Sequence, residues 1–145
     1  MNTAHFEKLE RMYLQANMNK HFYDTTTVKI GHETAEIGLT IAEKYFHALG
    51  AIHGSVYFKL LDDAAFFAVN SIVEDVFVLT TNFNIQLTRP ANQGTITATG
   101  KVKFISKSLF VAESRLVNEQ GKEIAFGTGN FMKSKVALTE EIGYK

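Results

Sequence analysis

The sequence predicts an α+β protein in which an antiparallel sheet of about six strands packs against one long helix. The helix is predicted from the stretch between Ser55 and Ser71, which is almost entirely apolar and has no proline, glycine or turn cluster. The sheet is predicted from segments that alternate apolar and polar residues, one hairpin before the helix and four runs after it. Consecutive strands joined by short turns pair antiparallel, so the helix is expected to cover one face of a single sheet.

Length and composition are those of one folded domain without net charge. A chain of 145 residues is long enough for a single core that buries roughly 70% of its unfolded surface. Fifteen basic residues cancel fifteen acidic ones, so no overall field favours nucleic acid or an anionic membrane as a partner. The absence of cysteine excludes thiol nucleophiles and thiolate metal sites. No segment has the ~18 apolar residues of a membrane span, and we expect a cytoplasmic protein.

The N-terminal segment is expected to be a short amphipathic helix. Apolar residues recur there at helical spacing, with acids and bases between them: Phe6, Leu9, Met12, Tyr13 and Ala16. We therefore divide the chain into a helical extension, residues 1–24, packed on a single domain, residues 25–145. The domain starts with a predicted hairpin, since apolar residues alternate from Val28 to Ile41 around a Gly-His-Glu turn.

The four runs after Asp75 have the pattern of strands. Apolar residues alternate with Asn, Gln, Thr and Lys from Phe83 to Leu87 and from Ile96 to Phe104. "ANQG" and "NEQGK" are expected to be turns between antiparallel neighbours, and Pro90 stands at a strand end. The glycines of "GTGNF" lie in a strand pattern with no following helix, which favours close packing over a phosphate loop.

Two adjacent acids, Asp62 and Asp63, interrupt the apolar helix. Neighbouring helical residues are about 100° apart, so the two carboxylates cannot share a face. Lys59, four residues before Asp63, predicts an ion pair worth only ~0.3 kcal/mol. Asp62 has no second base at helical spacing, and an unpaired buried carboxylate costs several kcal/mol or has a raised pKa. Such a group is a candidate for catalysis, although an acid facing solvent at the edge of the sheet would explain the same pattern.

The segment "HALGAIHGS", from His47 to Ser55, brings a glycine to the start of the helix. Backbone N–H groups at a helix N-terminus form a site for a carbonyl oxygen or an oxyanion. Asp62 would lie ~11–12 Å from Gly54 in one chain, too far for both to act on one carbonyl. A two-fold dimer with antiparallel helices would bring the two residues together, and it would also cover a helix that is apolar on nearly every side.

These residues resemble the PaaI-like (phenylacetate-degradation) thioesterases of the hotdog fold, within the 4-hydroxybenzoyl-CoA thioesterase superfamily. The resemblance runs from about Thr25 to Lys133 and includes His53-Gly54-Ser55, Asp62 and "TTNFNIQLTRPA". The family pattern is Asn-x-x-Gly-x-x-His-Gly-Gly, then Asp on the central helix, then Ser or Thr before Arg-Pro or Ser-Pro. It implies a hotdog fold, a sheet of about six strands wrapped around a long central helix.

The resemblance assigns roles to individual residues. Asp62 matches the general base or nucleophile, Gly54 the N–H that polarises the thioester carbonyl, and Thr80 the hydroxyl that positions water. Further matched positions are His53, Gly50, Arg89, Lys107 and Ser108, the last two near coenzyme A. His47 replaces the family's asparagine and Ser55 its second glycine, and a histidine there would add pH dependence.

The implied activity is hydrolysis of a small, aromatic or medium-chain acyl-CoA by a homodimer or homotetramer with composite active sites. No metal and no cofactor beyond the CoA of the substrate is expected. Two alternatives stay open: a non-catalytic acyl-CoA-binding protein, because of His47, and a dehydratase or hydratase in which His53 and Asp62 move protons. Lys101, Lys103 and Lys107 are either a CoA phosphate patch or a solvated strand face.

Overall fold

The computed structural model describes residues 2–145. The elements follow the predicted order of N-terminal helix, hairpin, long helix and four strands. The helices are α1 (Thr3–Gln15), α2 (Asn17–His21) and α3 (Gly54–Asn70), with short 3-10 helices η1 (Glu43–Tyr45) and η2 (Glu140–Ile142). The strands are β1 (Thr27–Gly31), β2 (Thr34–Thr40), β3 (Val76–Leu87), β4 (Thr95–Ile105), β5 (Phe110–Val117) and β6 (Glu123–Ala137).

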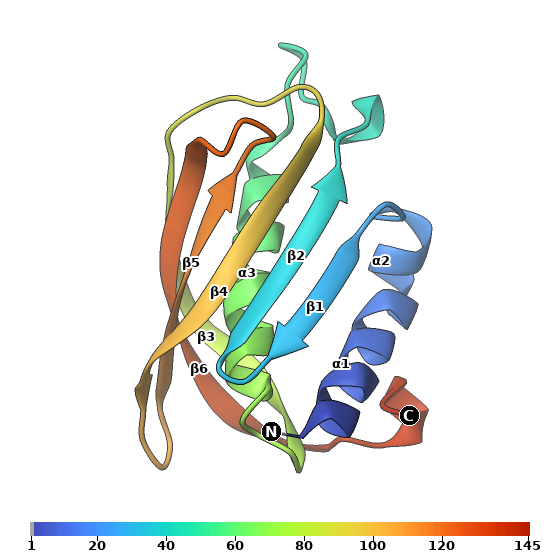
Figure 1. Ribbon diagram of the computed structural model, residues 1–145, viewed down its shortest axis with the longest axis vertical. Helices are drawn as coiled ribbons and strands as arrows, with labels where there is room; N and C mark the ends of the chain where they lie inside the picture. The colour runs from blue at the N-terminus through green and yellow to red at the C-terminus, as the bar shows by residue number, and fades with distance from the viewer. Residues whose placement is uncertain (1) are drawn as a thin grey trace.

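The strands form one six-stranded sheet in the order β1-β2-β4-β5-β6-β3, and every neighbouring pair is antiparallel. The sheet curves around α3, which runs along its concave face (Figure 1). The predicted α+β class and the number of strands are therefore confirmed. β3 follows α3 in the chain and pairs only with the last strand, β6, so it lies at an edge of the sheet.

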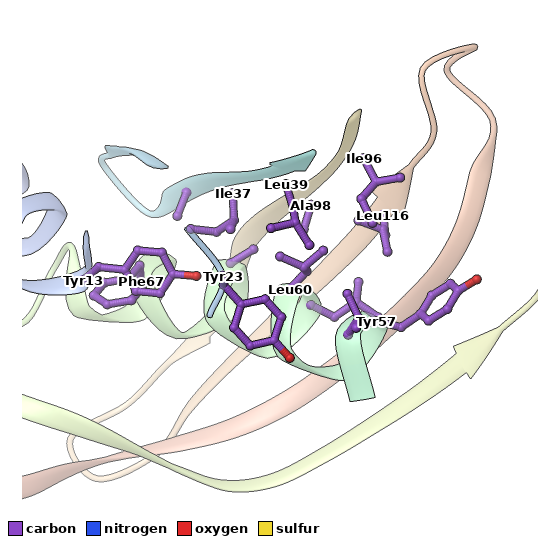
Figure 2. Packing of buried hydrophobic residues seen from close by; sticks show 14 of the residues in the cluster. Tyr13, Tyr23, Ile37, Leu39, Tyr57, Leu60, Phe67, Ile96, Ala98 and Leu116 are labelled. Carbon is purple, nitrogen blue, oxygen red and sulfur yellow. The ribbon is translucent and has the colours of Figure 1, made fainter. Parts of the chain in front are cut away.

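The long helix is held on the sheet by two apolar clusters, with the half-buried Phe66 and Phe83 packed against both. Leu60, Leu61, Ala64 and Ala68 of α3 have no exposed surface. Side chains from β2, β4 and β5 cover Leu60, Leu61 and Ala64, among them Ile37, Leu39, Ile96, Ala98 and Leu116 (Figure 2). Ala68 belongs to a second cluster, with Val102, Ala112 and Phe131. Burying each Leu or Ile contributes about 1.5–3 kcal/mol, which makes this layer the main source of stability.

Two contacts determine how closely α3 approaches the sheet. A methyl group at Gly100 of β4 would collide with the backbone carbonyl of Ala64, so the helix backbone rests directly on the strand at that glycine. On β5, the Ser114 hydroxyl is buried and donates a hydrogen bond of 2.7 Å to the carbonyl of Leu61. The position of α3, and with it that of Asp62, is thus fixed by backbone contacts as well as by side-chain packing.

The N-terminal segment differs from the prediction of one helix. It forms two helices, because Ala16 adopts an extended conformation with ψ 137° that ends α1 and precedes α2. α1 packs against β1 and lies beside the C-terminal end of the chain (Figure 1). Buried His5 joins these parts: one ring nitrogen lies 2.7 Å from the Tyr144 hydroxyl and the other 2.8 Å from the carbonyl of Asn70.

The packing role of the "GTGNF" glycines and one of the two predicted hairpin turns are confirmed. The turn at residues 118–121 joins β5 to β6, which pair antiparallel. The prediction for residues 91–94 is wrong, because they belong to a connection that crosses from the edge strand β3 to β4, and β4 pairs with β2 and β5 instead. A Cβ at Gly129 would collide with the ring of Phe83, so this glycine makes room for an aromatic side chain of β3. Among residues 2–145, no helix has the length and apolar character needed to cross a bilayer.

Candidate active site

Asp62 lies at the middle of α3, where the structure brings it against Thr80 of β3. The Thr80 hydroxyl donates a hydrogen bond of 2.8 Å to Asp62 Oδ1. Both residues are half-buried. An irregularity in the pairing of β3 with β6 follows Thr80 directly, between Thr80 and Asn82. Asp62 is therefore not the unpaired acid that its helical neighbours suggest, because its partner comes from 18 residues further along the chain.

The environment of Asp62 raises its pKa to about 6. Burial is the main cause, since loss of hydration disfavours the charged form. The hydrogen bond from Thr80 and the charge of Lys59 lower the pKa, and the charge of Asp63 raises it. A carboxyl with this pKa is about nine-tenths ionised at pH 7 and is a much better base than an ordinary aspartate.

Asp63 has a different environment, as the geometry of the helix predicts. The predicted ion pair with Lys59 is confirmed, with Nζ 2.6 Å from Asp63 Oδ2. The Tyr13 hydroxyl of α1 donates to the same oxygen over 2.6 Å, and Lys59 Nζ lies 3.2 Å from that hydroxyl. Burial, and next the charge of Asp63, raise the pKa of Tyr13 well above its usual value. Asp63 thus joins α3 to the N-terminal helix, while Asp62 keeps one oxygen free of protein partners among the described residues.

The loop before α3 holds its first turn in place. His53 is the N-cap of α3, and its Nδ1 accepts a hydrogen bond of 3.0 Å from the N–H of Ser55. The Ser55 hydroxyl lies 2.8 Å from the same nitrogen. Gly50 has φ +80° in the turn before this cap. His53 and Ser55 therefore cap the N-terminus of α3 through hydrogen bonds to each other. Gly54, at the first position of α3, has an N–H with no intrahelical acceptor.

Gly54 faces a small cleft of about 280 Å³ at the N-terminal end of α3. His47, Tyr57, Arg89 and Pro90 also line it. His47 is exposed, and its Nδ1 accepts a hydrogen bond of 3.1 Å from the N–H of Leu49. Asp62 does not face this cleft but a separate, larger cavity. As predicted for a single chain, Gly54 and Asp62 are not brought to one point.

The larger cavity has a volume of about 870 Å³ and lies between the N-terminal helices, α3 and β3. Its charged, amide and Ser/Thr side chains are those of Asp62, Thr80, Ser55, Asp63, Lys59 and Asn19, and Asn19 Oδ1 is buried without a hydrogen-bond partner in the described part of the chain. Most of the wall is apolar and includes Met12, Tyr13, Met18, Tyr23, Phe58, Phe66, Phe67, Phe77, Leu79 and Ile142. The residues of α1 and α2 were expected only to pack on the domain. Their helical spacing predicts burial, but nothing in it indicates which surface they bury.

The remaining predicted residues lie at opposite ends of the sheet. Arg89 is in the loop after β3, beside Gly54, and its carbonyl accepts a hydrogen bond of 2.7 Å from the buried Tyr57. Lys107 and Ser108 are in the exposed turn between β4 and β5. That turn is near the end of the sheet where Thr80 lies, because Phe110 and Thr80 both pair with Phe131. Within residues 2–145, no group of three or more acidic or histidine side chains is arranged to hold a metal ion.

Comparisons with known proteins agree with this geometry. The sequence model of a family described as "Thioesterase superfamily" matches residues 49–125, which include α3 with Gly54 and Asp62 and β3 with Thr80. The chain matches no sequence among the curated proteins.

Solved structures show the same fold. The PaaI protein of E. coli, from the phenylacetic acid degradation operon, has a TM-score of 0.83 at 22% identity, covering 94% of this chain and 97% of that chain. A phenylacetic acid degradation-related protein from Ralstonia eutropha has a TM-score of 0.76 at 18% identity over 88% and 98% of the two chains. PaaI from Thermus thermophilus has a TM-score of 0.68 at 20% identity over 75% and 93%. The hotdog fold predicted from the sequence is thereby confirmed.

Proposed function

The chain belongs to the thioesterase superfamily and is a thioester hydrolase, and we propose that it cleaves an acyl-CoA with Asp62 as general base or nucleophile. The observation that carries this proposal is the environment of Asp62: a half-buried carboxyl on the wall of a large cavity, oriented by Thr80, with a pKa of about 6. Both roles require the ionised carboxylate, which this pKa makes abundant at pH 7.

In the proposed reaction, Asp62 removes a proton from water as the water attacks the thioester carbonyl, or attacks that carbon directly. Thr80 keeps one carboxylate oxygen in place, so that the other is directed to the reacting atoms. The carbonyl oxygen acquires negative charge, which the free N–H of Gly54 and the positive end of the α3 dipole would stabilise. In the general-base route the CoA thiolate leaves and takes up the proton held by Asp62, and the acid is released. In the nucleophilic route the departure of the thiolate leaves an acyl-aspartyl anhydride, which a water molecule then hydrolyses to release the acid and regenerate Asp62. No cofactor beyond the CoA of the substrate takes part.

A dimer with composite sites is part of the proposal. Eight residues of helix separate Gly54 from Asp62, which is about 12 Å, and the two face separate hollows. The free edge of β3 runs from the cavity, which Leu79 and Thr80 line, to the cleft, which Leu87 lines. Leu79 and Phe58 near this edge are 50% and 41% exposed. An antiparallel partner across this edge would cover these side chains and bring Gly54 of one protomer to Asp62 of the other. Arg89, Lys107 and Ser108 would then flank the CoA from two chains.

The dehydratase alternative is less well supported. It requires His53 to move a proton together with Asp62, whereas the His53 nitrogen that faces the helix is occupied by the N–H and hydroxyl of Ser55. The ring serves as a helix cap there. An enoyl thioester formed without free thiol would overturn this preference.

The first test is thiol release from a panel of acyl-CoA thioesters by the natural protein and by Asp62→Asn. We expect the variant to lose at least about 10²-fold in kcat, because general-base catalysis contributes 10²–10⁴-fold. Asp75→Asn, on an exposed residue between α3 and β3, is the matched control and should keep full activity. Turnover that survives Asp62→Asn would refute the assignment.

Complementation tests the composite site. Gly54→Pro removes the N–H at a helix position where proline is well tolerated, and its Cβ would make only ordinary contact, 3.4 Å from Leu87. Each single variant should be inactive. A refolded mixture of Asp62→Asn and Gly54→Pro chains should regain activity, because a mixed dimer contains one intact site. A mixture that stays inactive although mixed dimers form would place the whole site in one chain.

A further inference from the structure

The cavity beside Asp62 is much larger than the proposed chemistry requires. Its volume of about 870 Å³ compares with the roughly 150 Å³ that hold a benzene molecule inside a protein. In the single chain the cavity would thus accept several times the volume of a single aromatic ring, and it is open on the side of Phe58 and Leu79, where the proposed partner subunit would pack. On size alone, a short acyl group would leave most of this apolar surface without contact.

The N-terminal segment builds the part of the wall that faces α3. Met12 and Tyr13 come from α1, Ala16 from the break between the helices, and Met18 from α2. Ile142, in the C-terminal η2, closes the same side. All of these residues lie outside the segment that matches the family, residues 49–125. The reacting groups therefore come from the family segment and the far wall from the ends of the chain.

The charged residues on this wall satisfy one another. Lys59 Nζ contacts Asp63 and the Tyr13 hydroxyl, and it lies 5.0 Å from the centre of the Tyr13 ring and 4.7 Å from that of Tyr23. Aromatic faces and an ion pair thus enclose the ammonium group. Because these polar atoms are used within the cluster, the surface left for a ligand is mainly carbon, supplied by aromatic and Met side chains.

We infer that this cavity holds an extended apolar acyl chain, of medium to long length, and that residues of the N-terminal helices determine the preferred length. The thioester would lie at Asp62, and the chain would run between α3 and the α1–α2 wall. Methionine side chains suit this task because they adapt to chains of different shape. This inference rests on the proposed thioesterase activity for its reaction, but it makes a separate statement about binding.

Chain length is the variable that tests it. With saturated acyl-CoA thioesters from acetyl to palmitoyl, kcat/KM should rise about fourfold for each added methylene, the factor that follows from ≈ 0.8 kcal/mol per buried CH₂. The rise should continue beyond the length of a single ring and stop where the cavity is full. A profile that is highest for acetyl-CoA, or that favours phenylacetyl-CoA over octanoyl-CoA, would overturn the inference.

A pair of tryptophan variants tests which residues limit the length. Ala16→Trp places a large ring on the cavity wall at a residue with extended backbone, which any side chain can adopt. It should lower the ratio of dodecanoyl to butyryl kcat/KM by at least tenfold. Ala4→Trp makes the same change at an exposed residue of α1 that does not line the cavity, and it should leave the ratio unchanged. Equal ratios in the two variants would contradict the role of the N-terminal helices.

Calorimetry with S-alkyl-CoA thioethers, which cannot be hydrolysed, separates this inference from the proposed reaction. Affinity should increase with alkyl length from butyl to dodecyl in the natural protein, and less so in Ala16→Trp. If affinity increases while no thioester is cleaved, the cavity assignment stands and the proposed reaction fails. If thioesters are cleaved while affinity is independent of length, the reaction stands and the cavity assignment fails.

Discussion

Replacing Thr80 by Val should move the pH dependence of hydrolysis to higher pH. Val keeps the shape of Thr but has no hydroxyl, so Asp62 loses the donor that lies 2.8 Å from its Oδ1. That hydrogen bond favours the charged carboxylate and lowers the pKa, against burial, which has already raised it to about 6.

The magnitude follows from the strength of the bond. A hydrogen bond to a charged group contributes about 1.5–3 kcal/mol, and one pKa unit corresponds to 1.36 kcal/mol. Asp62 is only half-buried, so solvent will replace part of the lost interaction, and a shift of about one unit is expected. The acidic limb of kcat/KM, near pH 6 in the natural protein, should then lie near pH 7.

The assay is thiol release with one acyl-CoA from pH 4.5 to pH 9, with Thr81→Val as the matched control. Thr81 is exposed, and its hydroxyl donates to the carbonyl of Asn130 instead of to Asp62. The control should keep the limb near pH 6. An unmoved limb in Thr80→Val, or a shift to lower pH, would refute the argument that Thr80 controls the ionisation of Asp62.

Two further predictions concern stability. The folded-state pKa of Asp62, about 6, is above the usual 3.8, so ionisation of this carboxyl opposes folding. Asp62→Asn removes the charge and should therefore raise the free energy of unfolding in urea by up to about 3 kcal/mol at pH 8 and by little at pH 4. An equal change at the two pH values would contradict this. Lys59→Met should lower the free energy of unfolding by about 3 kcal/mol, because it leaves the mostly buried Asp63 without its cation. The double variant Lys59→Met, Asp63→Leu should recover most of this loss. A double variant as unstable as the single one would mean that the unpaired Asp63 is not the cause of the destabilisation.

Much of the fold was predictable because its signals are local. The alternation between Ile96 and Phe104 and the uninterrupted apolar run from Ser55 to Ser71 determine which segments become strand and helix. The ion pair of Lys59 with Asp63 is equally local, since four residues of helix bring the two side chains together whatever surrounds them. The 12 Å separation of Gly54 from Asp62 within a chain follows from helix geometry in the same way.

The sequence by itself thus determined the element order, the helix and its acids, and, through resemblance, the candidate residues Asp62, Gly54 and Thr80, whereas the hydrogen bond between Thr80 and Asp62 depends on how β3 packs against α3. Only the tertiary structure decided what surrounds them. Tyr13 donates a hydrogen bond to Asp63, 50 residues away in the sequence. The break at Ala16 places Met18 and Asn19 of α2 on the wall of the cavity. Periodicity reveals that a helix has an apolar face, but the surface that this face meets depends on how separate elements dock. The size and lining of the cavity therefore became visible only when α1, α3 and β3 had been placed together.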